Sequence, residues 1–154
     1  MKMTSMMKLL VAGVLSVAST LSFAEINVKE GYVRAVPPGQ MNSAAFMQLH
    51  NPSDKTIAVI SGNSTAAKHV ELHTHTNDNG VMQMRQVERF DIPAKGSVTL
   101  QPGGHHVMLI GLENDLLPGS DVSLTLEFSD GSSQSVELPV QKIMPMPQGH
   151  HHHH

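Results

Sequence analysis

The chain has 154 residues and a formal net charge of −3, which suits one globular domain large enough to bury a core. It contains no cysteine, and this excludes disulfides, thiol nucleophiles and every zinc, iron–sulfur or blue-copper site with a cysteine ligand. The positive charges form no basic cluster of the kind that binds nucleic acid.

Residues 1–24 have the organisation of a secretory signal peptide. Lys2 and Lys8 precede an apolar run over residues 9–21, and the segment ends in the small-x-small sequence SFA. The run is short and contains glycine, serine and threonine, so a cleaved leader is favoured over a membrane anchor. No later run is long enough to span a bilayer. We expect export with cleavage after Ala24, and no lipid anchor, because there is no cysteine to acylate.

The sequence pattern of residues 25–142 predicts a single all-β domain. Short alternating segments are separated by turn sequences such as VPPGQMNS, TNDNG, QPGG and SDGSS, and no helical period extends over ten residues. We predict strands at residues 26–35, 44–50, 56–61, 69–75, 81–87, 97–100, 106–110, 122–128 and 135–142. Strands of this length and spacing are typical of an antiparallel β-sandwich or barrel with Greek-key connections.

Histidine and methionine gather on particular strand faces of this domain. Alternation places on shared faces Glu71, His73 and His75, then Met82 and Met84, then His106 and Met108, whereas Met47 and His50 fall on opposite faces. Taken singly, a methionine usually fills a core, and a histidine usually lies at the surface or is hydrogen-bonded in the core. Met84 and Met108, however, each lie beside or across from a histidine, on strands joined by tight turns. Two imidazoles and two thioethers suit monovalent copper, while zinc, calcium and magnesium prefer ligand sets with thiolate, carboxylate or other oxygens.

The spacing of these residues resembles the motif of the periplasmic copper chaperones called PCu(A)C. His73 is followed after ten residues by Met84, after twenty-one more by His106, and after one more by Met108. The surrounding segments NSAAFMQLHNPSD, VELHTH, GVMQMR and QPGGHHVMLIGL are also similar, and the resemblance covers about residues 31–141. It implies a cupredoxin-like β-barrel or sandwich that binds one Cu(I) near its surface through these four residues.

The same resemblance implies a function in copper delivery. Members of the family pass copper towards respiratory oxidase assembly, either to the oxidase's copper centres or through a Sco-type thiol protein. We therefore expect a periplasmic, monomeric copper chaperone that is not an enzyme. Three alternatives stay open: copper buffering or resistance without a dedicated recipient, a copper-dependent redox protein, and a structural β-sandwich with methionine packing. The missing cysteine argues against a blue-copper electron carrier.

Four further residues near the motif have roles that the sequence leaves open. His75 shares a strand face with His73 and can substitute for it or assist it, and Met82 is a candidate auxiliary thioether beside Met84. His105 points away from Met108, so we expect it at the rim rather than among the ligands. Met41 lies in a loop that the sequence alone does not place relative to the site.

Residues 143–154, IMPMPQGHHHHH, form a tail with little to bury. Five terminal histidines can be a purification tag or a native metal-binding extension. If the tail is native, Met144, Met146 and residues 150–154 can bind Cu(II) and stay close to the domain through a flexible linker. The hypothesis is that the tail captures Cu(II), and that the domain holds Cu(I) after reduction.

Overall fold

The computed structural model describes residues 13, 16, 18 and 25–143 of the chain. The expected signal peptide therefore lies almost entirely outside the described residues, and so does the tail after residue 143. Among the residues that are described, no helix has both the length and the apolar character needed to cross a membrane.

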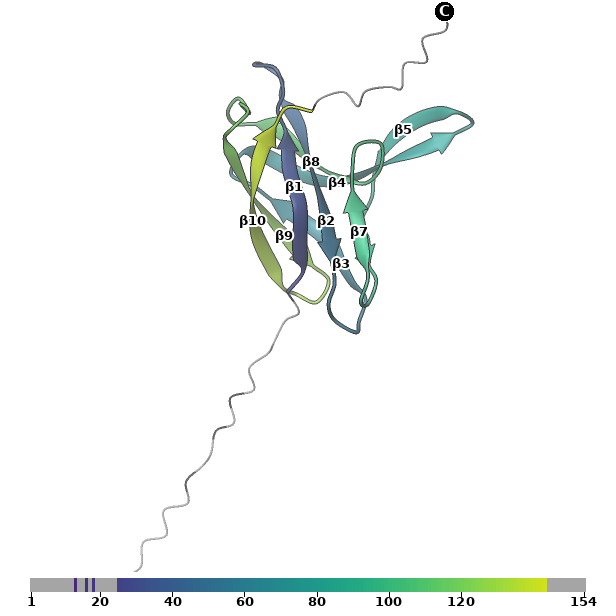
Figure 1. Cartoon of the computed structure of the whole chain (residues 1–154), viewed down its shortest axis with the longest axis vertical. Coiled ribbons are helices and arrows are strands. Elements are labelled where there is room, and N and C mark those ends of the chain that lie inside the picture. Colours follow the sequence, from purple (N-terminus) through teal and green to yellow (C-terminus); the bar gives the residue numbers. More distant parts are fainter. Residues whose placement is uncertain (1–12, 14–15, 17, 19–24, 144–154) are drawn as a thin grey trace, which may run out of the picture.

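The described part of the chain is built from ten β-strands and contains no helix (Figure 1). The strands are β1 (Asn27–Arg34), β2 (Asn42–His50), β3 (Ile57–Asn63), β4 (Ala67–Asp78), β5 (Val81–Gln86), β6 (Phe90–Ile92), β7 (Ser97–Leu100), β8 (His106–Leu112), β9 (Asp121–Phe128) and β10 (Ser133–Gln141). The all-β prediction is confirmed, and the nine expected strands are present, β7 with the predicted ends and the other eight with shifted ends. The sequence analysis missed β6, because three residues are too few to show an alternating pattern.

The strands are hydrogen-bonded in the order β5-β4-β8-β2-β1-β10-β9-β3-β6, and β7 pairs with β2. The sheet folds over on itself, so that the two halves of this strand order enclose a single core. Val107 from β8 and Leu124 from β9 belong to the same cluster of buried apolar side chains. Neighbours far apart in sequence, such as β2 with β8 and β3 with β9, provide the crossing connections expected of a sandwich.

One strand pair departs from the expected antiparallel arrangement. β1 and β10 are parallel, with Val33 opposite Val140, whereas all other pairs in the sheet are antiparallel. A parallel pair needs a long connection between its two strands. Here that connection is nearly the whole domain, because β1 and β10 are its first and last strands.

The core is aliphatic, and methionine fills part of it. Met47 is only 2% exposed and packs within the apolar cluster, as expected for a methionine in a chain with few aromatic residues. On β8, Val107 and Leu109 are fully buried in this cluster. Alternation along the strand therefore directs His106 and Met108 to the other face.

The β4–β5 hairpin projects away from the rest of the sheet (Figure 1, teal). Its two-residue turn is Asn79–Gly80, with positive φ angles of 52° and 86°, as a type I′ turn requires. The first part of β4 pairs with β8 and its last part pairs with β5. Because β4 is shared in this way, side chains from β4, β5 and β8 meet on one face.

Candidate metal centre

The register between β4 and β8 aligns four of the residues singled out from the sequence. His73 lies directly opposite His106, and Glu71 lies directly opposite Met108. The two imidazole rings are 5.8 Å apart between centroids. Cross-strand pairs of this kind point to the same face of the sheet, so these four side chains form one cluster.

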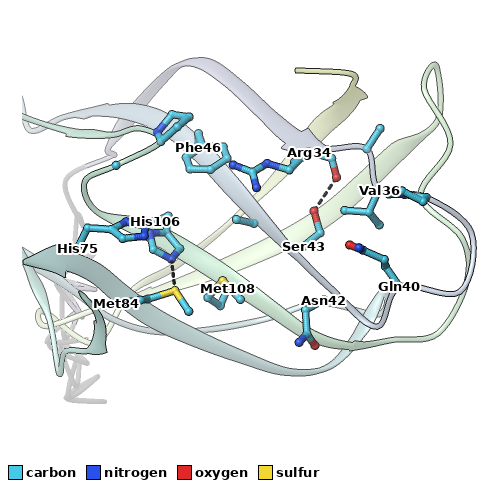
Figure 2. Close-up of a pocket in the computed structure, with 15 residues that line it drawn as sticks. Arg34, Val36, Gln40, Asn42, Ser43, Phe46, His75, Met84, His106 and Met108 are labelled. Carbon is cyan, nitrogen blue, oxygen red and sulfur yellow. Dashed lines mark hydrogen bonds between the residues drawn. The ribbon is translucent and has the colours of Figure 1, made fainter. Parts of the chain in front are cut away.

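The pairing of β4 with β5 adds two more residues to this cluster. His75 lies opposite Met84, and both side chains line a pocket of about 450 Å³ together with His106 and Met108 (Figure 2). The pocket continues past the ring of Phe46 to Arg34. Of the four residues in the copper motif, Met84, His106 and Met108 therefore line one pocket, whereas His73 does not line it.

His106 is held with one nitrogen available to a ligand. Its Nδ1 lies 3.0 Å from the carbonyl oxygen of Gly104, and since a carbonyl only accepts, Nδ1 carries the proton and donates. In the neutral ring the lone pair is then on Nε2, which lies 3.2 Å from the sulfur of Met84 (Figure 2). A nitrogen lone pair and a thioether sulfur thus face each other, and a soft cation could bind both.

Burial keeps His106 in the neutral form that binds metals. The residue is 3% exposed, and this burial lowers the pKa of its imidazole below the ordinary value of 6.5. The nearby His75, His73 and Arg34 lower the pKa further, while the hydrogen bond to Gly104 acts in the opposite direction.

One ring nitrogen of His73 has a hydrogen-bond partner, and the other has none. Its Nε2–H donates to the carboxylate of Glu71 at 2.7 Å, and its Nδ1 is buried without a hydrogen-bond partner. A carboxylate on one ring nitrogen leaves the lone pair on the other nitrogen and is a common arrangement around histidines that bind metals. The buried, unpartnered Nδ1 therefore fits the role of a ligand.

Histidine side chains alone do not complete a metal site. Within residues 25–143, no group of three or more His, Cys, Asp or Glu side chains is arranged to hold a metal ion. Any set of soft donors around His106 would have to include thioethers, and Met84 and Met108 line the same pocket. Such a set is nitrogen- and sulfur-based, which suits a soft metal ion and not calcium or magnesium.

The four residues whose roles the sequence leaves undecided occupy different positions. His75 lies in the pocket, with its ring 5.1 Å from that of His106. His105 points away from the site, as expected, and its ring lies 4.8 Å from that of Phe90. Met82 and Met41 are exposed and do not line the pocket. Strand alternation places His73 and His75 on the same face, so the sequence could not show which of them borders the cavity.

The fold and the pocket define a small cupredoxin-like domain with imidazole and thioether groups gathered at one cavity. The chain is similar to the copper-bound PCuAC domain from PmoF2, with a TM-score of 0.66 and 20% identity over 79% of this chain and 97% of that chain. It is also similar to Cu(I)-bound DR1885 from Deinococcus radiodurans, with a TM-score of 0.62 and 38% identity over 76% of this chain and 80% of that chain. The resemblance to PCu(A)C domains is thereby confirmed.

Residues 26–140 match the family described as "Putative lipoprotein LpqE-like", and the chain belongs to this family. A relative from Leifsonia xyli subsp. xyli (strain CTCB07), named "Putative lipoprotein Lxx21020", is 38% identical over 117 residues. The match covers 75% of this chain and 69% of the relative.

Proposed function

We propose that this protein is an exported copper chaperone that binds one Cu(I) through His73, Met84, His106 and Met108. The observation that carries the proposal is the approach of the unprotonated Nε2 of His106 to the sulfur of Met84 at 3.2 Å, inside a pocket that also holds Met108. The set of two imidazoles and two thioethers favours Cu(I), and DR1885, which is 38% identical, was solved with Cu(I).

The exposure of the site supports a role in copper transfer. Met84 is 50% exposed, and every residue of β5 is exposed, so a partner can reach this ligand without unfolding the domain. His106, by contrast, is buried and fixed by Gly104. Copper would leave by stepwise exchange, with the exposed thioether replaced first by a ligand of the recipient. The proposed recipient is an oxidase copper-site domain or a Sco-type protein, and the chain acts in this as a carrier rather than an enzyme.

The proposed location is the periplasm, reached through the signal peptide of residues 1–24. The lipoprotein names of the family and of its relative from Leifsonia support export. We further propose that the mature protein works as a monomer, with a domain over residues 25–142, and that a native tail over residues 143–154 binds Cu(II).

Titration with Cu(I) against a competing chelator tests the metal site. The full chain with residues 150–154 changed to alanine should bind one tight equivalent, and the Met84→Ala/Met108→Ala double variant should lose it, since both thioethers are donors. A Met82→Ala/Met41→Ala variant is the matched control and should bind as the parent does, because both methionines lie outside the pocket. Equal binding by the Met84/Met108 variant would show that these methionines only pack.

A transfer experiment separates delivery from buffering. The Cu(I)-loaded protein is mixed with the metal-free copper-binding domain of an oxidase, and transfer is followed by separating the two proteins at intervals and measuring the copper in each. Transfer faster than the release of Cu(I) to a chelator of equal affinity is expected for a chaperone, because ligand exchange occurs within a complex. Equal rates would favour buffering, which the histidine-rich tail also suits.

A further inference from the structure

His75 lines the pocket, although it is not one of the four residues of the copper motif. It lines the cavity with Met84, His106 and Met108, and its ring lies beside that of His106 (Figure 2). The centroids of these two rings are 5.1 Å apart, compared with 5.8 Å between His73 and His106. In the β4–β5 ladder His75 is directly opposite Met84, so it also faces the exposed thioether.

A single carbonyl holds His75 and His106 in fixed relation to each other. The oxygen of Gly104 accepts the backbone N–H of His75 at 3.3 Å and the Nδ1–H of His106 at 3.0 Å. Because a carbonyl oxygen has two lone pairs, it can accept both bonds. The backbone of one residue and the ring of the other are thereby anchored at the same point, which is the kind of preorganisation that a metal site needs.

The ring of His75 has a nitrogen that the protein leaves without a partner. Its Nδ1 is buried and makes no hydrogen bond, as is also true of His73 and of His105, but of these three residues only His75 lines the pocket. A buried polar atom without a partner is costly and is uncommon in folded proteins, so each such atom calls for a reason. A bond to a metal ion in the adjoining pocket would remove this cost.

His73 is placed differently, although it shares the strand face of His75. Its Nε2 is bound to Glu71 at 2.7 Å, and its side chain is not among those that line the pocket. Two imidazoles and two thioethers are therefore assembled around the cavity without His73.

We propose that His75 is itself a copper ligand of this domain, acting with Met84, His106 and Met108. The inference rests on the proposed function and adds a donor to its ligand set: His75 supplies an imidazole inside the pocket, while His73, held by Glu71, offers its Nδ1 from beside it. The ligand class is a soft monovalent metal ion, as for the site as a whole.

Competition titrations with Cu(I) and bicinchoninate test this assignment in the full chain with residues 150–154 changed to alanine. His75→Ala should weaken binding at least tenfold, which is about 1.4 kcal/mol, and should weaken it more than His73→Ala does. The matched control is His69→Ala, because His69 lies on the same strand and face but is exposed and away from the pocket. Binding by His75→Ala equal to that of the His69 control would overturn the inference.

A second measurement does not depend on any variant of His75. Imidazole ¹⁵N resonances of the chain with an intact domain should show a shift at His75 Nδ1 or Nε2 on addition of one equivalent of Cu(I). Unchanged His75 resonances, while those of His73 and His106 shift, would assign copper to the motif residues only. If the parent binds Cu(I) and the Met84/Met108 variant does not, the proposed function stands whatever the result for His75. If the parent binds no Cu(I), both fail.

Discussion

At the scale of single residues, the surroundings of His106 suit the role of copper ligand that we propose for it. Its ring is enclosed by Phe46, at 6.2 Å between ring centroids, and by His73 and His75 of β4. Gly104 fixes the proton on Nδ1, and burial disfavours a second proton. In the proposed site, copper would compete with few protons for Nε2, because metal ligands must be deprotonated before they bind.

These surroundings predict a pH dependence for the metal-free protein. His106 should titrate below 6.5 in the folded chain, measured through its ¹⁵N ring resonances as pH is lowered. In that range the unfolded chain binds a proton that the folded chain does not. The full stability is therefore present above about pH 6.5 and is lost as pH falls from there through the lowered folded pKa.

The His106→Gln variant is the control for this prediction. Denaturant unfolding of the parent and of the variant, compared between pH 7.5 and pH 5, should show a smaller loss of stability in the variant. A His106 resonance that titrates at or above its ordinary pKa would contradict the role given to burial.

At the scale of elements, the β4–β5 hairpin is the part of the fold that brings the Met84 sulfur to the pocket. Its turn sequence was readable, because Asn-Gly between alternating segments predicts a two-residue hairpin. All six residues of β5 are exposed, so the hairpin is held by its ladder with β4 and by its turn rather than by the core. The position of Met84 therefore depends on the geometry of the turn.

Changing Gly80 to valine should weaken copper binding and leave the stability of the domain nearly unchanged. Gly80 has φ of 86°, where a residue with a Cβ costs about 1–2 kcal/mol. This strain acts on a hairpin outside the core, so it should displace Met84 and lower the affinity for Cu(I). Competition titration and thermal unfolding of the same variant measure the two effects.

Gly131→Val is a closely matched control for Gly80→Val. Gly131 also has φ of 86° and lies in the β9–β10 hairpin, whose strands carry core residues such as Leu124 and Leu138. Here the expected pattern is reversed, with a lower unfolding temperature and unchanged Cu(I) affinity. Equal losses of affinity in the two variants would show that the β4–β5 turn has no special part in the site.

At the scale of the whole molecule, the parallel pairing of β1 with β10 connects the two halves of the sheet. Val33 and Val140, which face each other in this pair, are both buried in the core. Local sequence signals do not reveal such a contact, because no turn joins the two strands. Most of the fold was nevertheless predictable, since alternation and turn residues locate nine of the ten strands.

The sequence by itself determined the kind of site: a chain without cysteine, with His and Met at the spacing of a copper motif, can offer a soft metal ion only imidazole and thioether donors. Strand alternation also determined that His73 and His75 share a face. Only the tertiary structure decided which of them borders the pocket. That choice depends on where β4 leaves β8 and pairs with β5, and on the hydrogen bonds of Gly104 and Glu71. These are long-range pairings and local geometries, and the two-residue period of a strand carries no information about either.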